Sequence, residues 1–170
     1  MKKVKPDEVA YELALGQQGK KKSDKRFEQE FFKADSEGRR KLARCMAISW
    51  RELFEDPETT WYETELPADT EFINRIFDSG KGFMREIGMS HSDLQREYES
   101  EEMAQEFREV IDSVRKEQKE LARVIVLTND MKTYTILDGA RRALALRLEN
   151  KNIPVYLGYR SKFDSLKHFN

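Results

Sequence analysis

The residue types best suited to chemistry in this chain stand together at positions 138–142, in the order Asp-Gly-Ala-Arg-Arg. Gly139 lets the backbone approach a ligand closely, because it has no Cβ. A helix is predicted to begin directly after it, and a helix N-terminus offers free N–H groups and a positive dipole end. Arg141 and Arg142 in the first turn oppose that dipole, and a bound anion relieves the conflict. The segment therefore predicts a phosphate site, since guanidinium groups and a helix N-terminus both suit phosphate.

Asp138 has two candidate roles beside these arginines. Its carboxylate is a candidate ligand for Mg²⁺. The alternative is that Asp138 caps the helix or holds an arginine, while Arg141 and Arg142 extend over the protein surface. The residue types alone leave both interpretations open.

The elements around this segment follow a regular pattern. Residues 123–127 and 133–137 are β runs separated by a turn, which predicts a hairpin. Residues 140–148 are rich in Ala, Leu and Arg and predict a helix. A third strand is predicted over 153–157, where Pro154 favours a position at a sheet edge or near the start of the strand.

An earlier strand and helix are also expected. Residues 59–66 alternate in character and are rich in β formers, so they predict a strand with Trp61, Glu63 and Glu65 on one face. A helix is expected over 69–78, with Asp or Thr at its start. The chain as a whole is therefore expected to be α+β, with a small mixed sheet flanked by helices.

The first third of the chain has the features of a basic, helical arm. Segment 1–26 holds eight Lys/Arg and four Asp/Glu, so it carries a net charge of +4. We expect a short helix near 6–15, a flexible lysine-rich joint, an anchor of three phenylalanines between residues 27 and 32, and one core helix over 36–55. Binding to nucleic-acid phosphates or to a protein partner is the functional hypothesis for the arm, and a solubilising tail is the alternative.

A long amphipathic helix is expected between the two halves. Apolar residues recur at helical spacing up to residue 121, and the other faces are acidic over 97–112. One interpretation is a helix packed on the sheet. The alternative is a homodimer formed through helix 97–121, although the apolar stripe is short for a coiled coil.

The composition limits the class of protein. Charged residues make up 37% of the 170 residues, yet the net charge is only −1, which argues against a uniformly basic nucleic-acid coat. A single cysteine excludes an internal disulfide framework, and two histidines exclude a histidine-rich metal site. No apolar run suits a signal peptide or a membrane span, so a cytoplasmic protein without membrane contact is expected.

The C-terminal third resembles the ParB/sulfiredoxin-like superfamily. The run YTILDGARRALAL over 134–146, followed by IPVYL over 153–157, is similar to the strand, phosphate turn, Ala-rich helix and I-P-V strand of that family. The resemblance is strong over 133–157 and does not cover residues 1–55. It implies a ParB/sulfiredoxin-like domain over 56–160, after a basic helical extension over 1–55 and before a tail over 161–170. Stand-alone relatives are common in phages and mobile elements, so the resemblance also implies such an origin.

The resemblance assigns roles to individual residues. Gly139, Ala140, Arg141 and Arg142 correspond to the turn that cradles a nucleoside triphosphate, ATP or CTP with Mg²⁺, in ParB proteins and related kinases. Ala140 stands where relatives carry a Glu, His or Cys. In the kinase branch Asp138 would act with the metal, and a carboxylate near the first strand acts as a base.

Glu63 and Glu65 are the candidates for that base, and two solvent-facing strand residues are the alternative. The resemblance thus implies a nucleotide-binding protein that acts as a phosphotransferase or hydrolase, in which catalysis depends on positioning and charge neutralisation. The competing hypothesis is a non-catalytic module that binds nucleic acid or a protein.

Overall fold

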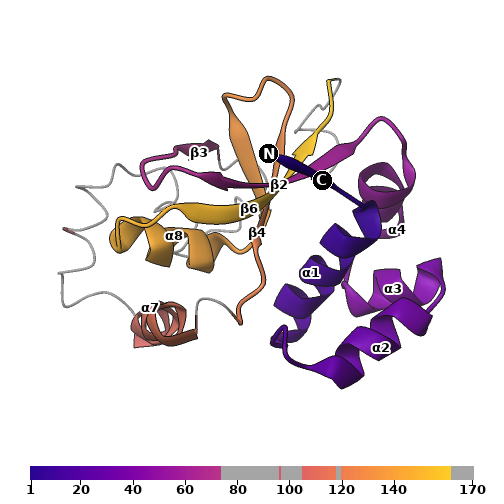
Figure 1. Cartoon of the computed structure of the whole chain (residues 1–170), viewed down its shortest axis with the longest axis horizontal. Coiled ribbons are helices and arrows are strands. Elements are labelled where there is room, and N and C mark those ends of the chain that lie inside the picture. Colours follow the sequence, from indigo (N-terminus) through magenta and orange to yellow (C-terminus); the bar gives the residue numbers. More distant parts are fainter. Residues whose placement is uncertain (74–95, 97–104, 118–119, 162–170) are drawn as a thin grey trace.

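The computed structural model describes residues 1–73, 96, 105–117 and 120–161, and it confirms the α+β class (Figure 1). The described strands form one six-stranded mixed sheet in the order β1-β2-β6-β4-β5-β3. They are β1 (Lys2–Val4), β2 (Thr60–Leu66), β3 (Phe72–Ile73), β4 (Val124–Thr128), β5 (Tyr134–Asp138) and β6 (Ile153–Tyr159). The described helical segments are α1 (Pro6–Gln18), α2 (Lys25–Lys33), α3 (Ser36–Leu42), α4 (Ala47–Trp50), the π-helical turn η1 (Arg51–Glu55), α7 (Gln105–Glu117) and α8 (Ala140–Leu148).

Strand β4 shows that the sheet is covered on both faces. Val124 and Val126 belong to a core shared with α8, whereas Ile125 and Leu127 belong to a core shared with α1 and η1. Because neighbouring side chains in a strand point to opposite faces, the two cores lie on opposite sides of the sheet. Figure 1 shows α1–α4 on one side of the strands, and α8 with α7 on the other.

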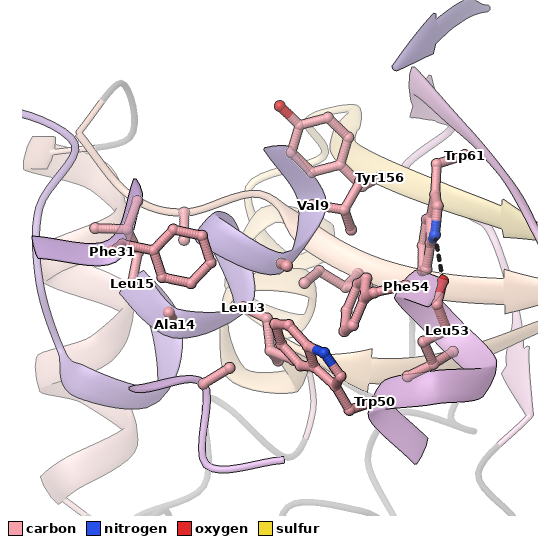
Figure 2. Close-up of a cluster of buried hydrophobic side chains, with 14 of the residues drawn as sticks. Val9, Leu13, Ala14, Leu15, Phe31, Trp50, Leu53, Phe54, Trp61 and Tyr156 are labelled. Atoms are coloured by element: carbon pink, nitrogen blue, oxygen red, sulfur yellow. Dashed lines mark hydrogen bonds between the residues drawn. The ribbon is translucent and has the colours of Figure 1, made fainter. Parts of the chain in front are cut away.

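The N-terminal helices are packed closely on the sheet. Trp61 of β2 is 1% exposed, and its Nε1 donates to the Leu53 carbonyl at 2.9 Å (Figure 2). The Phe54 ring stacks on it, with 5.8 Å between ring centroids. Residues 1–55 therefore supply a strand, β1, and the helical cover of one sheet face.

The lysine-rich segment after α1 is held to the rest of the chain. The Lys22 N–H donates to the Glu120 carbonyl at 3.1 Å, and the Ser23 N–H donates to the Glu120 carboxylate. The expected flexible joint is thus a turn tied to the segment before β4. Two of the three anchoring phenylalanines, Phe27 and Phe31, are buried as predicted.

The single helix predicted over 36–55 was wrong, because the chain breaks at Arg44. Arg44 has a φ of 50°, in the left-handed region that ends a helix. The Cys45 N–H then donates to the Arg40 carbonyl at 3.1 Å, which closes the end of α3. Apolar spacing did not reveal the break, since no glycine or proline marks it.

The helix predicted over 69–78 was wrong at its start. Phe72 and Ile73 form β3, which pairs in parallel with Tyr134 and Thr135 of β5. The remaining residues of that prediction, 74–78, lie outside the described ranges. Nonlocal pairing with β5 outweighs the local helical spacing here.

The C-terminal predictions agree better with the structure. The β4–β5 hairpin and the helix α8 are confirmed. Strand β6 lies inside the sheet, between β2 and β4, so the sheet-edge interpretation of Pro154 was wrong. Pro154 is the second residue of β6, which confirms the position near the strand start.

Helix α7 packs on α8 within the same chain. Arg115 pairs with Glu149 at 2.6 Å, and Val114 is 2% exposed in the core that α8 shares. The rest of the stripe predicted to form a homodimer, 97–104 and 118–119, lies outside the described ranges. None of the helices in the described ranges has the length and apolar character needed to cross a membrane.

Candidate functional site

A register shift in the β4–β5 hairpin decides which way Asp138 faces. Val126 pairs with Ile136, but Ile125 pairs with Asp138, so β5 holds one extra residue, Leu137, at this point. Such bulges re-aim the side chains that follow them. Asp138 therefore lies on the same face as Ile125, under the N-terminal helices.

Both carboxylate oxygens of Asp138 accept hydrogen bonds from this chain. Arg142 Nη2 donates to Oδ2 at 2.6 Å, and Gln17 Nε2 of α1 donates to Oδ1 at 2.9 Å. Asp138 does not cap α8, since the N-cap is Gly139 and no side-chain hydrogen bond caps this helix. Of the interpretations left open by the sequence, the structure shows the one in which Asp138 holds an arginine.

Gly139 is needed for this arrangement. Its φ of 89° is a conformation that L residues rarely adopt, and a Cβ at this position would stand 2.7 Å from Arg142 Nη2. The glycine thus makes room for the Arg142 guanidinium to fold back toward Asp138. Arg142 Nη2 also lies 3.4 Å from the Arg123 carbonyl oxygen, just before β4.

A pocket of about 740 Å³ lies at the N-terminus of α8. It is lined by Gly16, Gln17, Arg44, Ser113, Val114, Leu121 and residues 136–142. We call it the arginine pocket, because Arg44, Arg141 and Arg142 line it and Asp138 is the one acid among its described lining residues. Three arginines and one aspartate give the pocket a net charge of +2.

The arginine pocket fits a phosphate group. Its volume is in the range of small-molecule sites, and arginine forks bind phosphate with two parallel hydrogen bonds. Arg142 Nε is buried and has no hydrogen-bond partner among the described residues. An anion in the pocket would meet the positive end of α8.

Asp138 gives the pocket little with which to hold a Mg²⁺ ion directly. Both of its carboxylate oxygens accept hydrogen bonds, from Gln17 and from Arg142, and the Arg142 guanidinium already balances its charge. Among the described residues, no three His, Cys, Asp or Glu side chains gather as a candidate metal site. A metal here would arrive with the phosphates, as Mg²⁺ commonly does.

The structure does not bring Glu63 and Glu65 to the arginine pocket. Glu63, Tyr156, Ile125 and Asp138 are successive partners across β2, β6, β4 and β5, so Glu63 lies three strand spacings from Asp138, roughly 14 Å. Glu63 accepts from Arg123 Nη2 at 2.6 Å and pairs with Lys2 at 3.4 Å.

Glu65 lies farther along β2. It is exposed, and Asn152 Nδ2 lies 3.5 Å from its carboxylate. The base role of these two glutamates stays a prediction, and the geometry gives it no support.

Sequence reasoning missed the contributions of the N-terminal segment. Gly16 and Gln17 of α1 contact Asp138, and Arg44 lines the pocket from the loop after α3. The prediction of one core helix over 36–55 placed Arg44 inside that helix. The one sequence signal is weak: a glycine, Gly16, stands inside a predicted helix, and the structure shows that α1 lies against Asp138 at that residue.

Comparison of this chain with known proteins found no matching family model, no matching curated protein and no matching solved structure.

Proposed function

We propose that this chain binds the phosphate groups of a nucleotide in the arginine pocket. The observation that carries the proposal is the convergence of Arg44, Arg141 and Arg142 on the N-terminus of α8. Three guanidinium groups beside a positive helix end, with one aspartate among the described lining residues, leave the pocket with a net positive charge that attracts an anion. The sequence resemblance to the ParB/sulfiredoxin-like superfamily independently favours a nucleoside triphosphate, ATP or CTP, at the same turn.

The geometry supports nucleotide binding, and the proposal does not include a catalysed reaction. Asp138 is the one described acid that lines the pocket, and it is paired with Arg142. A general base must stand within hydrogen-bond reach of the proton it removes. Phosphotransfer and hydrolysis therefore stay predictions of the resemblance, as does a role for Mg²⁺.

A nucleotide is favoured over nucleic acid by the charges of the N-terminal segment. Lys22 pairs with Glu12 at 3.0 Å, Lys20 with Asp24 at 3.7 Å and Lys25 with Glu28 at 2.9 Å. Internal pairing of these lysines lowers the charge left to attract a polyanion. These pairs interrupt the positive charge of the arm, so its lysines do not form one continuous basic surface.

The test is calorimetric titration with ATP, CTP, GTP and ADP, each with and without Mg²⁺. The wild-type chain is compared with Arg141→Ala and with the double variant Arg141→Ala/Arg142→Ala. Arg26→Ala is the matched control, because this exposed arginine lies outside the pocket and its loss changes the net charge equally. Micromolar binding that falls at least tenfold in Arg141→Ala, and not in the control, is the expected result.

A folded wild-type chain that shows no heat with any of these nucleotides would overturn the proposal. Equal losses in Arg141→Ala and Arg26→Ala would do the same, since they would show an unspecific effect of net charge. Circular dichroism of each variant establishes that it is folded before the titration.

A further inference from the structure

A second pocket of about 330 Å³ adjoins the arginine pocket. It is lined by Leu13, Gln17, Ala43, Arg44, Cys45, Met46, Ser49, Leu53 and Leu137. We call it the apolar pocket, because most of these side chains are hydrophobic. Its walls come from α1, the break after α3, α4, η1 and β5, and so mainly from the segment that the family resemblance does not cover.

The two pockets share three residues. Gln17, Arg44 and Leu137 line both of them. A ligand that spans the pockets would therefore place a charged end among the arginines and an uncharged end among Leu13, Leu53 and their neighbours. Arg44 lies at the boundary between the two pockets, because it lines both.

Ser49 gives the apolar pocket an unused polar group. The residue is 5% exposed, and its Oγ has no hydrogen-bond partner among the described residues. A buried hydroxyl without a partner is costly, because it has given up hydrogen bonds to water. Its hydroxyl can both donate and accept, so it can pair with either kind of polar atom on a ligand.

Cys45, beside Ser49 in the wall of the apolar pocket, carries no charge at neutral pH. Burial raises the pKa of the Cys45 thiol to about 11, so that it stays protonated. Met46 adds a flexible and polarizable thioether, a side chain that adapts to flat or irregular groups. The pocket thus suits a neutral, largely apolar group with a polar edge.

We propose that the apolar pocket receives the base of the nucleotide whose phosphates occupy the arginine pocket. The inference rests on the proposed function, which concerns the phosphates alone. A heterocyclic base has apolar faces for the leucine walls and a polar edge for the Ser49 hydroxyl. A hydrocarbon chain would fill the same walls but would leave that hydroxyl unpaired.

The experiment compares inorganic triphosphate with ATP, CTP, GTP and UTP by calorimetry. The wild-type chain is expected to bind at least one nucleotide tenfold or more tightly than inorganic triphosphate. Ser49→Ala is expected to lose about fivefold to tenfold of that nucleotide's affinity, the equivalent of one hydrogen bond, and none of the triphosphate affinity. The variant removes a hydroxyl for which the described part of the chain offers no hydrogen-bond partner, so its fold is expected to persist.

Ile48→Ala is the matched control. This neighbour of Ser49 is 70% exposed and does not line the apolar pocket, so both affinities should remain unchanged. Arg141→Ala should weaken triphosphate and nucleotide alike, because it acts on the phosphates.

Two results would overturn the inference and leave the phosphate site standing. One is equal affinity for inorganic triphosphate and for all four nucleotides. The other is a nucleotide preference that Ser49→Ala leaves unchanged, which would show that the base lies elsewhere. Absence of binding to triphosphate and to every nucleotide would instead overturn the proposed function, and the inference with it.

Discussion

Arg142 and Asp138 form an ion pair across the first turn of α8, with 2.6 Å between Nη2 and Oδ2. The side chains are 16% and 13% exposed, so solvent screens the pair only partly. Asp138 neutralises one of the three arginines that line the pocket, and a bound phosphate would compete with it for Arg142. The aspartate therefore sets how strongly the pocket attracts an anion.

Asp138→Asn is expected to tighten the binding of a metal-free nucleotide. The change keeps the shape of the side chain and removes a negative charge beside the phosphate site. We expect roughly fivefold higher affinity, the equivalent of about 1 kcal/mol for a partly exposed charge. Calorimetric titration in the absence of Mg²⁺ measures it.

The same variant separates this role from metal binding. If Asp138 is a Mg²⁺ ligand, Asp138→Asn will weaken nucleotide binding in the presence of Mg²⁺. Glu65→Gln is the control, because it removes the same charge from an exposed residue of β2. Tighter binding of similar size in Glu65→Gln would contradict a local effect of Asp138.

Gly16→Ala is expected to lift α1 off the Asp138–Arg142 pair. A Cβ at Gly16 would collide with the Asp138 carboxylate and stand 3.3 Å from Arg142 Nη2. Overpacking of this kind costs about 1–3 kcal/mol in the free energy of unfolding. Urea denaturation measures the loss. The double variant Gly16→Ala/Asp138→Ala, compared with Asp138→Ala alone, removes the obstructing carboxylate and should recover part of it; no recovery would contradict the collision with Asp138 as the cause, because alanine itself favours the helix.

Trp61→Phe is expected to destabilise the core between β2 and the N-terminal helices. The change leaves the buried Leu53 carbonyl without its donor and opens a cavity beside Phe54. Together these effects should lower the free energy of unfolding by about 2–4 kcal/mol. Trp50→Phe is the comparison, because Trp50 Nε1 donates to Ser36 and Glu55, whose side chains water can reach. A smaller loss in Trp61→Phe than in Trp50→Phe would contradict the argument.

The parts of the fold that local sequence encodes were predictable. The hairpin of β4 and β5 has two β runs and a short polar turn, and α8 has nine residues of mostly strong helix formers. The glycine at the start of α8 and the arginines that follow it were recognisable as a candidate phosphate site for the same reason. These features depend on residues that are neighbours in the chain.

The rest depends on contacts between distant residues. Strand β3 forms because it pairs with β5, about sixty residues later, although its own sequence suits a helix. The bulge that turns Asp138 toward α1 leaves no mark in the composition of β5. The sequence also gives no sign of the role of Arg44. Its own left-handed backbone conformation ends α3 and brings it to the pocket, and such a conformation is normally predicted only where a glycine stands.

Asp130 makes the β4–β5 turn sensitive to acid. Backbone N–H groups of Thr133 and Lys132 donate to its carboxylate and hold its pKa at about 2, below the ordinary value of 3.8. A pKa lowered by folding stabilises the native state above pH 3.8, and this contribution disappears as the pH falls toward 2. Asp130→Asn should therefore unfold more easily than the wild type at pH 7 and equally easily near pH 2.

Thermal unfolding monitored by circular dichroism between pH 2 and pH 7 tests this expectation. Asp112→Asn is a suitable control, since Asp112 is an exposed residue of α7 outside the turn. A difference between Asp130→Asn and the wild type that stays constant down to pH 2 would contradict the role of the carboxylate charge.

Arg44→Gly is expected to move stability and binding in opposite directions. Glycine adopts the φ of 50° without the left-handed penalty of about 1–2 kcal/mol, which exceeds its entropic cost of about 0.5–1 kcal/mol. The free energy of unfolding should therefore rise slightly. Nucleotide affinity should fall at least tenfold, because a charged fork is lost from the pocket.

Arg44→Lys tests the same residue with the backbone conformation and the charge retained. A lysine provides a point charge but no planar fork, so it should restore part of the affinity and none of the stability gained with glycine. If Arg44 has only a structural role, Arg44→Gly will change stability alone, and both variants will bind nucleotide as the wild type does.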